Sequence, residues 1–457
     1  MLLLVTSIVA AELPQPPEPQ AAQQVPLITP EPVAARTDWL SFHADTLHTE
    51  FGVLTERRAA ADGQFYLRAQ PRIEARLGSA WSLRLQPLLE SWHELGLDDA
   101  QRTRLDSAES YLRYRNTRRE ITLGAQFLRW GRVDHEPPLE IGSRMDLIRL
   151  PLDDWHRQRR SVLALNWREW GSQLNYEALL IPIFRPSRLP DRDSIWYPIN
   201  QRNGRFLGIR PSTGLSLVGR LGTIDDSYPR GRFGGAGLRV GQETGRLEWH
   251  LAVQNLRRAQ PYFEIDRELQ PLLPDQISLI DVLRARTRRP TFQVRHPMTW
   301  AVGGDLGWSG QRSSWRMEAN WSEKLPVTSS GFRMITPSAL DWAVAWERFF
   351  GTLDARISLQ LRGRDIFADR PVLDRYQRVA LLGDAQINLA RGRWSLRLRF
   401  LEGLLPTTQV LNPEIARITE HFGSWYLGYH RFAGSSATPG EFYADNDLIV
   451  AGWRWQP

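Results

Sequence analysis

The chain has 457 residues, of which 42% are hydrophobic and 24% charged, and it contains no cysteine. Its mean hydropathy is −0.40. No run approaches the roughly 18 apolar residues that a membrane helix needs, which excludes a helical membrane protein. The 58 basic residues are all arginine except Lys324, and the net charge is +7. Because they are spread among acids without a dense basic stripe, we expect no nucleic-acid partner.

The first 38 residues differ in composition from the rest. Residues 1–11 are apolar and end in the small residues Ala10 and Ala11, which predicts a truncated signal peptide cut near Ala11 or Glu12. Residues 12–38 are rich in proline, glutamine and alanine, a composition that buries no core and predicts an extended periplasmic arm. The folded part is then expected to span 39–457.

After Trp39, hydrophobic and polar residues alternate with a period of two, as in strands that bury or expose one face. The clearest stretches are 65–77, 246–255, 353–362 and 393–400. Similar patterns occupy 81–91, 108–115, 121–129, 161–167, 172–184, 298–309, 314–323, 342–350 and 377–389. Many of these stretches reach about 9 to 13 residues, which exceeds a typical soluble strand and matches a tilted membrane crossing.

The connections between these stretches alternate in length. Tight links are expected at 78–80, 116–118, 169–171, 243–245, 310–312, 351–352 and 390–392. Longer segments lie between them, at 93–106, 130–159, 185–232, 257–297, 324–340 and 364–376. Short periplasmic turns that alternate with long outer loops are typical of outer-membrane β-barrels.

Aromatic residues lie near the expected strand ends. Trp300 and Trp308 share a face and stand about 20 Å apart along a tilted strand, close to the height of a barrel's apolar band. The last segment, 448–455, alternates and ends in aromatics, like the terminal strand that the barrel-assembly machinery recognises. With both termini periplasmic, the strand number is even. The sequence therefore predicts an all-β fold, a transmembrane antiparallel β-barrel of about 16 to 18 strands in the Gram-negative outer membrane.

Charged residues occupy the polar face of several strands. If the apolar face meets lipid, the polar face lines a pore, and rows of arginine opposite acids create a transverse field. Pairing across strands to brace the barrel is the alternative interpretation. The pore-lining candidates are Arg68, Arg72, Glu74, Arg76, Arg84, Arg113, Arg115, Arg356, Arg362, Arg393, Arg397 and Arg399. Arg393, Arg397 and Arg399 have no acidic neighbour on their own strand, which makes them the best candidates for anion contact.

The segment 130–159 is rich in acids, histidines and arginines. Its spacing fits no metal motif, so we expect neither a metal nor a cofactor, and no catalytic residue is assigned. We expect this loop to fold into the lumen and to be held there by salt bridges. Its constriction candidates are Arg144, Asp146, Asp153 and Asp154. Loops 185–232 and 257–297 are expected to form an extracellular cap or a constriction.

Residues 120–190 carry a more specific pattern. It consists of Gly124–Gly131 at a strand end, Arg144 with Asp146, Asp153-Asp154 before Arg160, and the run Pro182–Pro186. This pattern resembles a family of large proteobacterial outer-membrane proteins, porin-like and of unknown function. The resemblance implies transport of envelope lipids or hydrophobic compounds and a possible link to an envelope exporter system.

Three functions follow from these patterns. The first is an outer-membrane channel for small polar or anionic solutes or for envelope lipid-type compounds, with outer-membrane lipid and lipopolysaccharide as its surroundings. The second is a barrel enzyme or a plugged, lipid-handling barrel, in which Asp134 or His135 would support hydrolysis. The third is a soluble periplasmic all-β protein. We expect the first and therefore no enzyme activity.

Overall fold

The fold is described from a computed structural model, which covers residues 39–56, 61–96, 101–149, 152–153, 155–227, 231–273, 276–374 and 378–455. The expected signal peptide, the proline-rich arm and Asp154 lie outside these residues. Trp39–Pro457 form one compact unit.

This unit is a closed antiparallel β-barrel with eighteen crossing strands, within the predicted range. The first strand, β1, pairs with the last, β29, and so closes the sheet. Two crossings are each interrupted, one at Gln86 between β3 and β4 and one at 108–109 between β5 and β6. The barrel strands are β1 (Leu40–Leu54), β2 (Gly63–Arg76), β3 (Trp81–Leu85), β4 (Pro87–Leu95), β5 (Gln101–Ser107), β6 (Ser110–Arg115), β7 (Arg119–Gln126), β10 (Val162–Trp170), β11 (Asn175–Ile181), β15 (Gly235–Thr244), β16 (Leu247–Arg257), β19 (Met298–Ser309), β20 (Ser313–Ser322), β23 (Ser338–Phe350), β24 (Ala355–Phe367), β25 (Val379–Leu389), β26 (Trp394–Leu405), β27 (Thr407–Thr419), β28 (Gly423–Gly434) and β29 (Leu448–Trp455).

The alternation in sequence becomes an inside and an outside, because successive side chains of a strand point to opposite faces. On β20, Trp315 and Trp321 are 43% and 41% exposed, whereas Glu318 between them is 3% exposed and faces the lumen. Trp300 and Trp308 are likewise exposed, at opposite ends of β19. The outer face is thus apolar with aromatics near both rims, as the sequence predicts.

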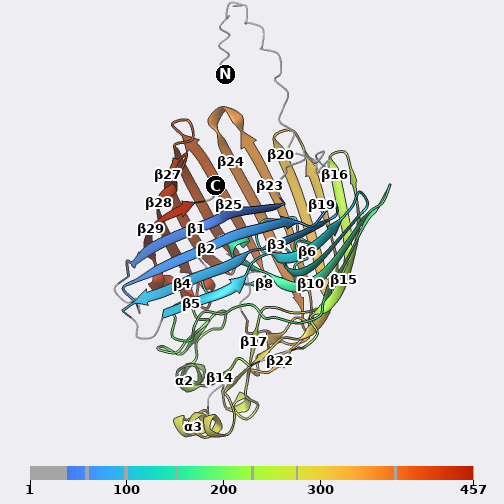
Figure 1. Cartoon of the computed structure of the whole chain (residues 1–457). Helices are drawn as coiled ribbons and strands as arrows, with labels where there is room; N and C mark the ends of the chain where they lie inside the picture. The colour runs from blue at the N-terminus through green and yellow to red at the C-terminus, as the bar shows by residue number, and fades with distance from the viewer. Residues whose placement is uncertain are drawn as a thin grey trace, which may run out of the picture. The chain divides into compact units, whose positions relative to one another are not determined.

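The connections sort by length to the two ends of the barrel (Figure 1). One end carries tight turns, and both Leu40 and Trp455 lie there. The other end carries the long loops, of which the longest are 127–161, 182–234 and 258–297. Two details differ from the prediction. The expected long segment 93–106 shrinks to 96–100, because β4 and β5 extend into it, and Pro406 alone links β26 to β27 at the long-loop end.

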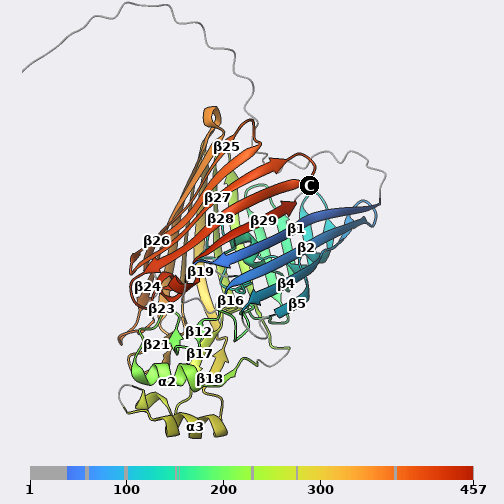
Figure 2. The same ribbon diagram turned by 90° about the vertical axis from the view of Figure 1, so that its left-hand side faces the viewer.

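Loops 182–234 and 258–297 build a small layer beyond the long-loop end (Figures 1 and 2). It contains α2 (Thr213–Leu221), α3 (Leu279–Arg288) and a sheet of β14 (Ile224–Asp225), β17 (Tyr262–Ile265) and β18 (Phe292–Arg295). Serine caps begin both helices, and Ser278 with Asp281 forms a full capping box on α3. Leucine, valine and phenylalanine side chains from both loops form its core. These loops therefore form a cap, one of the two predicted outcomes.

The remaining elements are short. They are β8 (Arg144–Met145), α1 (Trp155–Gln158), β9 (Arg159–Arg160), β12 (Ile199–Asn200), β13 (Arg205–Phe206), η1 (Gln270–Leu272), β21 (Val327–Thr328), β22 (Met334–Ile335), η2 (Gly351–Leu353), α4 (Pro439–Phe442) and η3 (Ala444–Asn446). Among the described residues, no helix is both long enough and apolar enough to cross a membrane.

Candidate functional site

The loop 127–161 between β7 and β10, which we call the lumen loop, turns into the barrel. Its first half, 127–143, begins with apolar residues, whose exposure to water at the barrel rim would be unfavourable. Leu128, Trp130 and Leu139 are at most 7% exposed and pack with Leu179 of β11 and Ala252 of β16, both of which face the lumen. Burial of these side chains draws this half of the loop against the inner wall.

Glycines in that wall make the close approach possible. A Cβ atom added to Gly237 of β15 would lie 2.7 Å from the Trp130 ring. One added to Gly303 of β19 would lie 2.7 Å from Leu139 Cδ2. Both distances are shorter than real Cβ contacts, so any larger residue would push the loop away from the wall.

Glu318 of β20 holds the same half of the loop through its backbone. Its carboxylate accepts hydrogen bonds from the N–H groups of Arg132, Val133 (2.6 Å) and Leu139 (3.4 Å). Such convergent N–H groups stabilise a carboxylate that is otherwise costly to bury. The loop side chain of Asp134 adds a bidentate pair with Arg316, with both distances 2.8 Å.

Glu140 stabilises this half of the loop through contacts with other residues of the same loop. It accepts hydrogen bonds from Arg159 (2.9 Å) and from the Ser143 hydroxyl (3.2 Å). Burial nevertheless raises the pKa of Glu140 to about 7, because the Arg159 charge offsets only part of the desolvation and the Glu318 carboxylate nearby repels a second negative charge.

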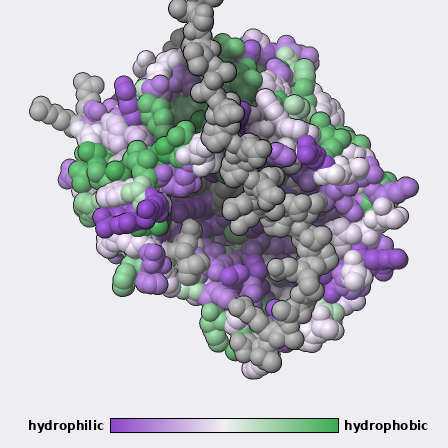
Figure 3. Space-filling view, turned by 90° about the horizontal axis from the view of Figure 1, so that it is seen from above, coloured by the Kyte–Doolittle hydropathy of each residue, from purple (hydrophilic) through white to green (hydrophobic). Residues whose placement is uncertain are grey.

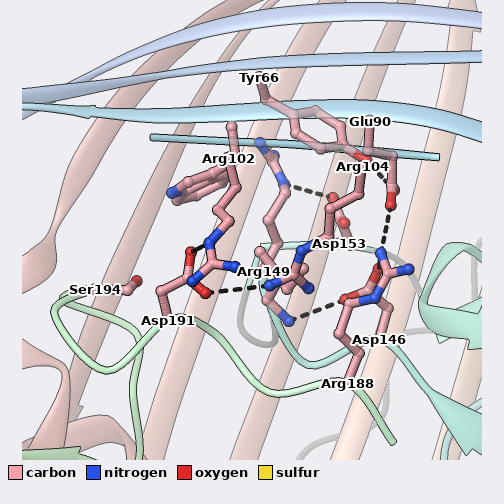
Figure 4. Close-up of a pocket in the computed structure, with 12 residues that line it drawn as sticks. Tyr66, Glu90, Arg102, Arg104, Asp146, Arg149, Asp153, Arg188, Asp191 and Ser194 are labelled. Carbon is pink, nitrogen blue, oxygen red and sulfur yellow. Dashed lines mark hydrogen bonds and ion pairs between the residues drawn. The ribbon is translucent and has the colours of Figure 1, made fainter. Parts of the chain in front are cut away.

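The second half of the lumen loop, 144–161, lies against the opposite wall and is held by ion pairs (Figure 4). Arg160 pairs with Glu90 of β4 and with Asp146 of the loop itself. Arg188 from loop 182–234 pairs with the same Glu90 at 3.1 Å and with Asp106 of β5 at 2.7 Å. Together these five charged groups form one network, which joins the lumen loop and loop 182–234 to the barrel wall.

A second ionic contact reaches β1. Arg149 donates to Glu50 of β1 at 2.5 Å and to Asp153 at 3.0 Å, and its side chain is 3% exposed. Its guanidinium also lies 4.0 Å from the centre of the Tyr66 ring, a cation–π contact. Because both halves are anchored on opposite walls, the lumen loop crosses the lumen.

Two cavities adjoin this crossing. The larger, which we call the vestibule, has a volume of about 550 Å³ and lies between β5 and the loops 182–234 and 258–297. The smaller, of about 20 Å³, lies deeper, between Tyr66, Trp92 and Arg149. They share Arg102, Arg104, Arg188 and Asp191. A volume of about 20 Å³ holds roughly one water molecule, so this smaller cavity, which we call the slot, has no room for a solute.

Most of the predicted pore-lining residues face the lumen, where acids accompany them. Arg72 lies 2.9 Å from Asp45, and Arg84 lies 2.6 Å from Glu74 and 3.1 Å from Glu109. The other pairs are Arg68 with Glu90, Arg113 and Arg115 with Glu120, Arg356 with Glu347, and Arg362 with Glu136. Arg76 is exposed at the end of β2.

The structure separates the three arginines predicted for anion contact. Arg393 is exposed in the turn before β26. Arg397 pairs with Asp384 on the neighbouring strand β25. Arg399 donates to Asn412 and to the carbonyl oxygen of Leu152 in the lumen loop. The register of the sheet thus brings Asp384 of β25 within reach of Arg397.

Of the constriction candidates, Arg144, Asp146 and Asp153 all lie in the second half of the lumen loop, and Arg144 pairs with Asp106 at 3.2 Å. Burial lowers the pKa of Arg144 to about 10. Sequence reasoning missed Glu318 and Arg188. The inward parity of Glu318 on β20 was a usable signal, whereas nothing near Arg188 points to the lumen. Among the described residues, no group of three His, Asp or Glu side chains could hold a metal ion.

No protein-family model matches the chain, and no characterised protein is significantly similar in sequence. Solved structures are similar in fold. Acinetobacter baumannii OccAB1 matches with a TM-score of 0.50 and 7% identity over 91% of this chain and 95% of that one. OmpF of Salmonella typhi, in complex with daunomycin, matches at 0.42 with 9% identity over 91% and 97%. OmpT of Vibrio cholerae matches at 0.38 with 11% identity over 91% and 97%. The likeness to OccAB1 bears on the fold alone: the chain is a porin-like β-barrel.

Proposed function

We propose that the protein is an outer-membrane channel for small hydrophilic solutes in which the lumen loop forms the constriction. One observation carries the proposal: a loop crosses the lumen of a closed barrel and leaves polar space on both sides. At the long-loop end this space is the vestibule. At the short-turn end, hydrophilic side chains gather around a hollowed centre (Figure 3).

The outer face supports a place in the membrane. Leu251, Val302 and Leu398 are 58%, 54% and 41% exposed, which would be unfavourable in water but suits lipid. The short turns and both ends of the described barrel would then lie in the periplasm. The terminal strand β29, with Trp453 and Trp455, supports recognition by the barrel-assembly machinery.

The vestibule lining favours polar solutes with weak charge selection. It contributes Arg102, Arg104, Arg188 and Arg192, opposed by Asp191, Asp193 and Asp226. Asp191 pairs with Arg102 at 2.8 Å and with Arg104 at 3.1 Å. Nearly balanced charges of both signs orient dipolar solutes and give at most a modest anion preference.

We infer that solutes pass through the slot, whose volume of about 20 Å³ is too small for them, so conduction there requires the second half of the lumen loop to move. Planar-bilayer recordings of the purified full chain should show discrete current steps with slight anion preference. A plugged barrel would give no current although the protein inserts. A soluble periplasmic protein would migrate identically with and without heating and stay out of detergent micelles. Either result contradicts the proposal.

A further inference from the structure

Four basic residues lie at the long-loop rim of the barrel, where β15 begins and where β16 and β20 end. We call Arg232, Arg257, Arg258 and Lys324 the basic rim cluster. Arg258 Nε donates to the Lys324 carbonyl oxygen at 3.2 Å, which joins the ends of β16 and β20. Arg257 donates to the carbonyl oxygens of Phe233 (3.2 Å) and His296 (2.7 Å). These hydrogen bonds hold the guanidinium groups of Arg257 and Arg258 at the rim, close to the backbone of residues 233 and 324.

The cluster stands directly above the apolar outer face. Along β16, Leu251 and Val253 point outward at 58% and 38% exposure, and Arg257 follows on the same face. On the neighbouring strands, Trp300 and Trp321 are 52% and 41% exposed. From the middle of the barrel to the rim the order is aliphatic, indole, cation. A membrane lipid presents acyl chain, interface and phosphate in that same order.

Two charges of the cluster, those of Arg232 and Arg257, are less neutralised than the charges in the lumen. Lys324 pairs with Glu323 at 3.2 Å. Within the described part of the chain, no ion pair joins Arg232 or Arg257 to a carboxylate. These two arginines also lie close enough to repel each other. A dianionic or monoanionic group placed between them would relieve that repulsion.

Other parts of the same rim differ. On β24 the outward residue at this level is Asp365, and on β26 it is Glu402, which accepts a hydrogen bond from Gln409 at 3.0 Å. Carboxylates at these positions repel phosphates. On β20 the carboxylate at this level, Glu323, is paired with Lys324, so the net positive charge lies on the arc of β15, β16, β19 and β20.

We propose that the basic rim cluster binds the phosphate group of a membrane lipid whose acyl chains lie along Trp300 and Trp321. Guanidinium groups offer the fork of N–H donors that matches phosphate oxygens. The indoles below select a lipid over free phosphate. In the orientation of the proposed function, which this inference requires, the site faces the outer leaflet and the phosphorylated glycolipid there.

The test uses the detergent-purified full chain and measures bound lipid by native mass spectrometry. The probes are bisphosphorylated lipid A, the same lipid without phosphates, and inorganic phosphate. We expect retention of the bisphosphorylated form only. The variant R257A/R258A/K324A should bind it about 100-fold more weakly, since each surface cation contributes about a factor of five. Single variants K324Q and R257Q should each weaken binding about fivefold if the triple variant does not fold.

The matched control removes Arg348 and Arg417, which lie over Phe350 and Trp394 at the opposite rim. R348A/R417A should bind lipid A like the unmodified chain. Equal retention of the dephosphorylated lipid, equal loss in the control, or binding of inorganic phosphate with the same affinity would overturn the inference. Conductance separates the two proposals: a conducting triple variant without lipid A binding supports both, whereas failure of the unmodified chain to insert contradicts the membrane placement itself.

Discussion

The two halves of the lumen loop are held in different ways. The half 127–143 has ion pairs such as Asp134 with Arg316, but it also buries Trp130 and Leu139 against glycines of the wall, and Glu318 binds its backbone. The half 144–161 is held by guanidinium–carboxylate pairs around Glu90 and Asp146. Apolar packing tolerates little displacement, whereas ion pairs in a network can exchange partners. The difference suggests a fixed anchor and a movable gate within one loop.

The largest loss of stability is expected when a wall glycine that contacts the anchor is replaced by a larger residue. Gly237→Leu should displace the Trp130 ring and destabilise the barrel by about 3 kcal/mol, because the inserted side chain has no room. Thermal unfolding in detergent measures the loss. Gly351→Leu is the matched control, since a Cβ there meets nothing within 4 Å. Equal stability of the two variants would refute the close packing.

A smaller loss of stability is expected when the Glu318 carboxylate, which binds the loop backbone, is removed. Glu318→Ala removes the acceptor of three N–H groups and should cost about 2 kcal/mol. Hydrogen exchange should rise at the amides of 132–139 and stay unchanged at 144–149. Glu323→Gln, at the rim, serves as the control. Faster exchange in both halves would mean that the loop moves as one unit.

The pH dependence should also be confined to the anchor. The pKa of Glu140 is raised from its ordinary value of 4.5 to about 7, so folding favours its neutral form. The anchor should therefore be most stable below about pH 4.5, lose stability as the pH rises to about 7, and change no further above that. The loss is at most about 3 kcal/mol. Exchange of the 130–140 amides from pH 4.5 to 8 measures it, and Glu140→Gln should reduce the trend. An opposite trend would exclude Glu140 as its cause.

The smallest loss of stability is expected from a substitution in the gate, the half 144–161. Asp146→Asn weakens the contacts of Arg160 and Arg188, but both arginines keep Glu90, so the unfolding temperature should fall by only a few degrees. Open probability in bilayers should rise severalfold. Asp365→Asn on the outer face is the control. An unchanged current would show that the ionic half does not limit conduction.

The sequence predicted the barrel and its faces because alternation, turn spacing and terminal aromatics are local patterns. It predicted that 130–159 enters the lumen from its charge content. The sequence did not predict the interaction partners of the charged residues in the lumen. Arg397 looked free of acids because Asp384 lies on the next strand, and pairing depends on register. Glu318 looked like one more lumen charge, because its three backbone partners come from a loop far away in sequence.

The absence of cysteine in the chain allows one direct test of the central claim. Ile148 lies in the gate and lines the slot, whereas Leu251 lies on the outer face. Single-channel currents of Ile148→Cys and Leu251→Cys are recorded before and after a bulky, charged thiol reagent is added. A channel gated by the lumen loop predicts block of the Ile148→Cys current and no change for Leu251→Cys. Undiminished current through fully labelled Ile148→Cys would contradict it.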